Sequence, residues 1–301
     1  MKKLFLFLIF TLPVIAQAKL NVVATLPDFG AIAQEIGGDK VTVTTIAKGT
    51  EDPHFVDARP SFIRVLNKAD ILIEGGAELE IGWLPPLVNG ARNAKILADA
   101  PGHLILSRHI HLKDLPTGPV DRSMGDVHPL GNPHYWLDPD NGKIMATDIA
   151  EALSRLDSPN QAFYQANLKR FSEHLDQKIV QWTKALEPFK GTRVMTYHKS
   201  FDYFLDRFGF ELAGTVEPKP GVEPSPTYIN SLLPRVKGAG VKLVMVEPFR
   251  PRKTPEYIAQ AIGAKLLIVP EKVGANDKVR DYFSLFDYNV TQISIALKQS
   301  K

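Results

Sequence analysis

Short apolar segments alternate with amphipathic segments through the first third of the chain. Apolar, β-branched runs occur at 20–26, 41–46 and 71–73, and apolar residues at helical spacing occur at 29–36 and 61–66. A run of alternating strands and helices is typical of a parallel sheet with right-handed crossover connections. We therefore expect an α/β lobe at the N-terminal end of the chain.

The same alternation returns after residue 190, without an obvious sequence repeat. Strands are predicted at 193–197, 210–215, 241–246 and 265–269, and helices at 200–208, 227–236, 254–262 and 281–297. Pro255 in the first turn of one helix and Gly263 after its end are ordinary helix boundary signals. A second α/β lobe of the same kind follows from this pattern.

One long helix is predicted between the two lobes, over 160–187. Its apolar stripe has residues three and four positions apart, which is the spacing of an amphipathic helix: Leu168, Phe171, Leu175, Ile179, Trp182 and Leu186. Such a helix is roughly 40 Å long and can brace two lobes. A coiled-coil dimer is the alternative, but the stripe is short for one. The predicted organisation is a lobe at 19–158, a linking helix at 159–188 and a lobe at 189–301.

The first eighteen residues have the form of an export signal. Lys2 and Lys3 precede an apolar stretch over 4–15, and Ala16-Gln17-Ala18 has the small-x-small pattern of a cleavage site. The stretch is too short to span a bilayer. We expect cleavage after Ala18, a mature start at Lys19 and a location in the periplasm.

Composition narrows the classes of protein. The 301 residues are 44% hydrophobic and 23% charged, which is globular, and the net charge of +3 falls to +1 without the two lysines of the leader. No basic run with interleaved aromatics predicts a nucleic-acid partner. The chain has no cysteine, so we expect no disulfide, no thiolate metal ligand and no lipid anchor.

Two short motifs share one pattern around a histidine. Asp52-Pro53-His54-Phe55 and Asn132-Pro133-His134-Tyr135 both read Asp/Asn-Pro-His-aromatic. Proline fixes its own backbone angle and restricts the residue before it, so the histidine is carried on a stiff backbone, as a metal ligand requires. One Pro-His pair is ordinary loop chemistry. The second, matching copy favours ligation.

A third histidine and an acid complete a candidate set. His54, His198 and Glu247 all follow predicted strands, and ligands of parallel sheets bind beyond the carboxyl ends of strands. If the lobes face each other across a cleft, His54 and His134 come from one side and His198 from the other. Three neutral imidazoles and a carboxylate suit tetrahedral Zn²⁺, whereas Mn²⁺ prefers more oxygen.

The motifs resemble those of the zinc/manganese solute-binding proteins of ABC importers, the TroA-like helical-backbone metal receptors. The similarity covers essentially the whole mature chain and rests on 52–54, 132–139, 197–201, 223–225 and 283–290. It implies two α/β lobes joined by one long helix, with the metal buried in the cleft between them. It also implies a monomer that delivers its ion to a membrane permease and ATPase. His54, His134 and His198 occupy the family's histidine positions, and histidine at the third position more often accompanies zinc.

The fourth ligand departs from the family pattern. Where the family usually has an aspartate, this chain has Arg280, with Asp281 next to it and Asp277 three positions earlier. We predict Asp281 as the fourth ligand. Asp277 and a water molecule are the alternatives, and a helix-capping carboxylate is the structural alternative for Asp281. The family's zinc members often carry a long His-rich loop, whereas this chain has only His128 there; His128 could pass metal inward.

The remaining polar residues have plainer interpretations. We expect Glu247 to cap a helix or orient a histidine, and Asp138 to do similar supporting work. We expect the other histidines to lie at the surface: His103, His109, His111 and His174. The alternative function is a periplasmic zinc hydrolase with a three-histidine open site, but no His-Glu-x-x-His or Gly-x-Ser-x-Gly motif supports it. An adhesin role has no repeat or anchor to support it.

Overall fold

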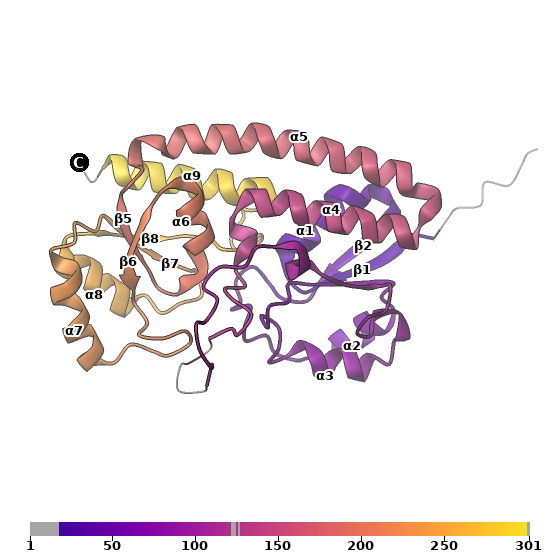
Figure 1. Cartoon of the computed structure of the whole chain (residues 1–301), viewed down its shortest axis with the longest axis horizontal. Coiled ribbons are helices and arrows are strands. Elements are labelled where there is room, and N and C mark those ends of the chain that lie inside the picture. Colours follow the sequence, from indigo (N-terminus) through magenta and orange to yellow (C-terminus); the bar gives the residue numbers. More distant parts are fainter. Residues whose placement is uncertain (1–17, 122–124, 126, 300–301) are drawn as a thin grey trace, which may run out of the picture.

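The computed structural model describes residues 18–121, 125 and 127–299, so all but the last residue of the predicted export signal, 1–18, lies outside the described residues. Two four-stranded parallel sheets form the two lobes, in the orders β2-β1-β3-β4 and β6-β5-β7-β8 (Figure 1). The first contains β1 (Leu20–Ala24), β2 (Val41–Thr45), β3 (Ile71–Glu74) and β4 (His103–Ile105). The second contains β5 (Arg193–Thr196), β6 (Glu211–Thr215), β7 (Leu243–Val246) and β8 (Lys265–Ile268).

Helices cover both sheets and continue the alternation predicted from the sequence. The N-terminal lobe has α1 (Pro27–Gly37), α2 (Pro60–Asn67), α3 (Leu84–Ala91) and α4 (Pro139–Leu156). The C-terminal lobe has α6 (Asp202–Phe208), α7 (Pro226–Lys237), α8 (Lys253–Ile262) and α9 (Tyr282–Lys298). Proline lies in the first turn of α1, α2, α3, α4 and α7, where its missing N–H costs nothing. The prediction of two parallel-sheet lobes is confirmed.

A single long helix, α5 (Gln161–Leu186), runs along both lobes beside α9 (Figure 1). Two aromatic residues of the stripe read from the sequence face α9: the ring centroids of Phe171 and Phe283 are 5.1 Å apart, and those of Trp182 and Phe286 are 4.9 Å apart. Trp182 also donates its ring N–H to Asp287 over 2.8 Å. These contacts make α5 the brace that its periodicity predicts.

The apolar core is continuous from one lobe to the other. One cluster of buried residues includes strands of both sheets, the inner faces of α1, α4 and α5, and the aromatic face of α9. At the junction, the Tyr282 hydroxyl donates to the main-chain oxygen of Trp136 over 2.7 Å, and the Trp136 ring N–H donates to the main-chain oxygen of Glu271 over 2.7 Å. A second, smaller core covers the other face of the C-terminal sheet. Because one core extends through both lobes, it does not mark where one lobe ends and the next begins. The lobe boundaries at 158/159 and 188/189 therefore remain predictions.

Two elements were not predicted. Helix α3 begins at Leu84, and Pro85-Pro86, which look like a loop signal in the sequence, occupy its first turn. Strand β4 has three residues at the edge of its sheet, too few for a periodic pattern. With β4 present, each lobe has the same number and arrangement of strands.

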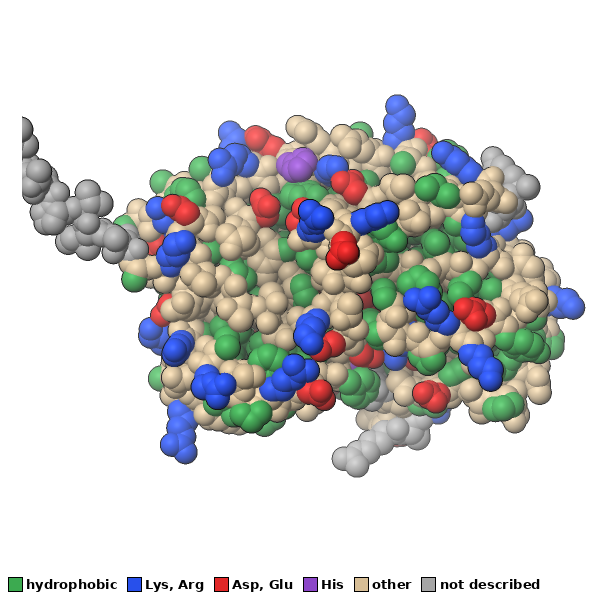
Figure 2. Space-filling model, turned by 180° about the vertical axis from the view of Figure 1, so that it is seen from behind, with side chains coloured by type: hydrophobic (Ala, Val, Ile, Leu, Met, Phe, Trp, Pro, Cys, Tyr) green, Lys and Arg blue, Asp and Glu red, His purple; other side chains and the backbone are tan. Residues whose placement is uncertain are grey.

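The surface carries both signs of charge. On the face shown in Figure 2, acidic and basic side chains are interspersed with apolar ones, in keeping with a net charge of +3. Within the described part of the chain, no helix combines the length and apolar character needed to cross a membrane.

Candidate metal centre

The two Asp/Asn-Pro-His motifs form the same turn. Asp52 Oδ1 accepts hydrogen bonds from the main-chain N–H of His54 over 3.0 Å and from its ring Nδ1 over 2.9 Å. Asn132 Oδ1 accepts the same two bonds from His134, again over 3.0 and 2.9 Å. Since the oxygen can only accept, Nδ1 carries the proton and Nε2 presents a lone pair. The residue two positions before each histidine therefore fixes its tautomer and direction.

The His198 ring also has its Nδ1 bound to an oxygen, but the partner comes from a distant part of the chain. It lies in the connection between β5 and α6, and its Nδ1 donates to the carboxylate of Glu217, which follows the neighbouring strand β6. Glu217 is 2% exposed. Our sequence reading missed it, although an acid directly after a strand beside β5 is a signal for this position. A carboxylate on Nδ1 leaves His198 Nε2 free for a metal.

The structure brings the three predicted histidines to one point between the lobes. One ring nitrogen from each of His54, His134 and His198 lies within 4.8 Å of the other two. Their ring centroids are 5.1 to 5.5 Å apart. His134 and His198 are buried, and the buried Nε2 of His134 has no hydrogen-bond partner. A buried, unpartnered nitrogen in a cluster of imidazoles fits a divalent cation.

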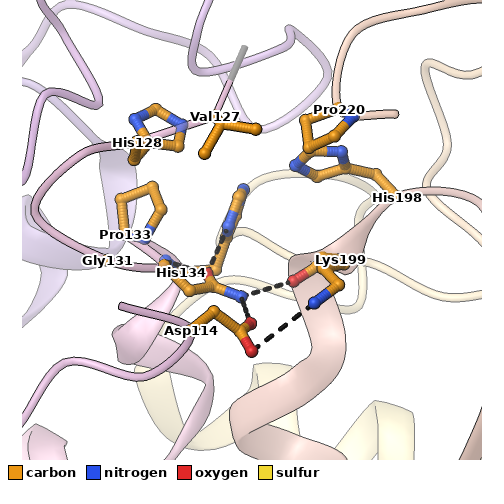
Figure 3. A pocket seen from close by; sticks show the side chains of 10 residues that line it. Asp114, Val127, His128, Gly131, Pro133, His134, His198, Lys199 and Pro220 are labelled. Atoms are coloured by element: carbon orange, nitrogen blue, oxygen red, sulfur yellow. Dashed lines mark hydrogen bonds and ion pairs between the residues drawn. The ribbon is translucent and has the colours of Figure 1, made fainter. Parts of the chain in front are cut away.

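A cavity of about 200 Å³ opens onto this cluster (Figure 3). His134 lies at its inner end, with His128 and His198 on opposite sides (Figure 3). Asp114, Lys199 and Pro220 complete much of its lining. Residues of both lobes line the cavity, so the candidate centre lies between them.

His134 and His198 are held in the neutral form, which binds metal. Burial lowers the pKa of His198 to about 3, with the neighbouring charges of His54 and Arg250 acting in the same direction. Burial also lowers the pKa of His134 well below its usual value, and the other histidines add to this. Rings with such a low pKa are neutral at pH 7, so a metal need not displace a proton from their Nε2 atoms.

Asp281, predicted as the fourth ligand, does not join the cluster. Its carboxylate accepts a hydrogen bond from Ser284 N over 2.7 Å, and Asp281 N donates to Ser284 Oγ over 2.9 Å, which makes a capping box at the start of α9. The Asp281 carboxylate therefore accepts a hydrogen bond from a main-chain N–H that would otherwise lack a partner at the start of α9. Asp277 is exposed in the loop before α9, away from the three histidines. Asp281 and Asp277, the two aspartates considered for the fourth ligand, thus both lie outside the cluster of histidines.

The other predicted supporting residues act elsewhere. Glu247 accepts from the Ser200 hydroxyl over 2.6 Å, which anchors the segment after His198 without touching its ring. Asp138 caps α4 and accepts from Arg207 Nε over 2.9 Å.

The remaining histidines lie away from the centre. His109 pairs with Asp148, with most of its ring exposed, and His111 and His174 are exposed as expected. His103 is not the surface residue we expected, because its ring is 11% exposed beside Glu74.

The low pKa of His134 predicts a pH dependence of the metal-free protein. Between pH 6.5 and the low pKa of the folded state, the unfolded chain binds a proton at His134 and the folded chain does not, so stability falls as pH falls. Relative to His134→Gln, the wild type should lose about 1.4 kcal/mol per pH unit below 6.5. Urea unfolding of both proteins at pH 7, 6, 5 and 4 measures this difference. Parallel pH profiles would contradict it.

The fold and the geometry define a class: a two-lobed substrate-binding protein braced by one long helix, with an imidazole centre for a metal ion between its lobes. Residues 22–296 match the family described as "Zinc-uptake complex component A periplasmic". The match spans most of the chain, and the protein belongs to this family.

Named relatives include proteins for two metals. The chain is 28% identical over 288 residues to the manganese ABC transporter substrate-binding lipoprotein PsaA of Streptococcus pneumoniae, covering 93% of this chain and 89% of PsaA. It is 27% identical over 250 residues to the high-affinity zinc uptake system protein ZnuA of Brucella abortus, covering 74% of each. The same fold occurs in a crystal structure of ZnuA, with a TM-score of 0.76 and 24% identity over 92% of this chain and 99% of that one.

Proposed function

We propose that this protein captures Zn²⁺ in the periplasm and delivers it to the permease and ATPase of an ABC importer. Family membership supports the role of metal-binding component of such an importer. The observation that carries the proposal is the convergence of His54, His134 and His198 at one buried point. Each ring has its Nδ1 bound to an oxygen, so all three Nε2 atoms are available to a single ion.

The preference for zinc over manganese rests on this chain's own ligands, because the relatives include proteins named for each metal. Three imidazole nitrogens form a borderline-soft set that suits Zn²⁺, while Mn²⁺ favours oxygen ligands. The carboxylates of Asp52 and Glu217 face the ring Nδ1 atoms and support the histidines from behind. They increase the basicity of the ligands without adding oxygen to the first coordination shell.

We propose that the protein binds and releases the metal ion and catalyses no reaction. A three-histidine zinc site with an open position can activate water, so a hydrolase is the competing function. The relatives found are named as transporter substrate-binding and uptake proteins, which favours binding. Assays of zinc-loaded protein on ester, phosphate and peptide substrates separate the two. Turnover that His198→Ala abolishes would establish the hydrolase instead.

The proposed location is the periplasm. The export signal predicted at 1–18 supports this. The streptococcal relative PsaA is named as a lipoprotein.

Metal content and thermal stability test the proposed function. Protein purified without chelator should contain one zinc per chain by elemental analysis. Zinc at a thousandfold excess over its Kd should stabilise the folded state by about 4 kcal/mol. This corresponds to a rise in Tm of roughly 10 °C, and Mn²⁺ should give a smaller one. His111→Ala, which changes an exposed histidine, should keep the full rise. An equal Tm with and without zinc would contradict the proposal.

A further inference from the structure

A fourth histidine, His128, lies against the three that were predicted as ligands. Its Nε2 is 3.1 Å from Nε2 of His54, and the two ring centroids are 5.1 Å apart. The His54–His134 and His134–His198 pairs have the same centroid separation of 5.1 Å. His128 lines the cavity opposite His198 (Figure 3). Four imidazoles therefore form one contiguous group, with His128 joined to it through His54.

The contact between His54 and His128 brings together two ring nitrogens that can both act as metal ligands. His54 donates its Nδ1–H to Asp52, so its Nε2 offers only a lone pair when the ring is neutral. The ring of His128 has the main chain of Ala77 as a hydrogen-bond partner. If Nδ1 makes that bond, as in the other three rings, two lone pairs face each other over 3.1 Å. Such a pair requires a proton or a cation between the nitrogens.

The separation of the two nitrogens also fits coordination. Two nitrogens bound to a tetrahedral zinc at about 2.0 to 2.1 Å lie roughly 3.3 to 3.4 Å apart. The observed 3.1 Å needs only a small adjustment to reach this value.

Carboxylates do not compete with His128 for the fourth position. Over the residues that the structure describes, the group whose ligand atoms lie within 4.8 Å of one another contains His54, His134 and His198. Among those described residues, neither an Asp or Glu oxygen nor a nitrogen of His128 lies within this limit of all three. Asp52 and Glu217 are bound to ring Nδ1 atoms, and Asp281 caps α9. His128 instead meets the group through one member, with its Nε2 3.1 Å from that of His54.

We propose that His128 is the fourth protein ligand, closing a four-imidazole site in place of the carboxylate predicted from the sequence. The inference rests on the proposed function, since it concerns the same ion. A set of four nitrogens discriminates against Mn²⁺ more strongly than three nitrogens and one oxygen. His128 is less buried than His134 and His198, so solvent reaches it more easily than it reaches those two ligands.

X-ray absorption at the zinc edge tests the proposal directly. The zinc-loaded wild type should show four imidazoles, and His128→Ala should show three with an oxygen in the vacant position. Zinc Kd should rise roughly 10- to 100-fold in His128→Ala, and the ratio of Mn²⁺ to Zn²⁺ affinity should rise further in His128→Asp, which supplies an oxygen ligand. His111→Ala, at an exposed histidine, should match the wild type.

The outcomes separate this inference from the proposed function. Three imidazoles in the wild type, or an unchanged spectrum in His128→Ala, would overturn the role of His128 alone, provided that His134→Ala still loses zinc. Zinc binding that survives unchanged in His134→Ala would instead overturn the centre and the proposed function. Circular dichroism of each metal-free variant shows that a loss of binding is not a loss of folding.

Discussion

The change His134→Ala is expected to weaken zinc binding by roughly 10²- to 10³-fold. Four-ligand zinc sites in small domains are worth about 10 to 16 kcal/mol, so one ligand contributes about 2.5 to 4 kcal/mol. His134 should lie at the upper end because it is 1% exposed and its Nε2 has no partner other than an ion. Water replaces a buried ligand poorly. Competition against a chelating zinc indicator measures the change in Kd.

A matched control separates the loss of a ligand from a general effect of removing a ring. His103 is a second shielded histidine of the N-terminal lobe, 11% exposed beside Glu74 and outside the cluster. His103→Ala should keep the wild-type Kd, even if it lowers Tm. Unfolding of metal-free His134→Ala should remain cooperative. Wild-type zinc affinity in His134→Ala would exclude the centre described above.

Replacing Lys272 by methionine should destabilise the protein by about 3 to 5 kcal/mol, the usual cost of breaking a buried ion pair by removing one partner. Lys272 is fully buried, forms an ion pair with Glu271, and has its ammonium 4.6 Å from the centre of the Phe249 ring. Without it, the Glu271 carboxylate remains buried at 1% exposure. Burial already raises the pKa of the nearby Glu247 to about 8, with the charge of Glu271 contributing in the same direction. Urea unfolding of the metal-free protein measures the loss.

Two further variants identify the cause. Lys278→Met makes the same change at an exposed lysine in the same loop and should alter stability by less than about 0.5 kcal/mol. Glu271→Gln combined with Lys272→Met removes both charges and should recover much of the lost stability. If the double variant is as unstable as Lys272→Met, lost packing around the lysine stem, and not the unpaired carboxylate, is responsible.

Features that depend on local sequence were predictable. The stripe of α5 could be read from the chain because a helix repeats its burial pattern every three to four residues. His54 and His134 could be identified because their turns are complete within three residues, and Asp52 and Asn132 were visible in the same motifs. Their role as acceptors for Nδ1 was not recognised, although their position two residues before each histidine indicates it.

Features that depend on tertiary pairing were not predictable in this way. Glu217 supports His198 because β5 and β6 are neighbours, and strand order is not written in any local pattern. His128 meets His54 from a segment 74 residues away with no periodicity of its own. Asp281 lies one residue away from the position where the family usually has its aspartate. In the structure this residue is the N-cap of α9, and its carboxylate binds the first turn of that helix.

The core shared by the two lobes constrains how the ion departs. Swinging the lobes apart would expose the aromatic junction of Trp136, Tyr282 and Phe286, and each such side chain is worth several kcal/mol of burial. If the shared core keeps the lobes together, we expect the residence time of the ion to be set by stepwise exchange of its ligands and not by the rate of a hinge. A permease that presents its own donor atoms to the cavity could draw the ion out while leaving the body of the carrier undisturbed.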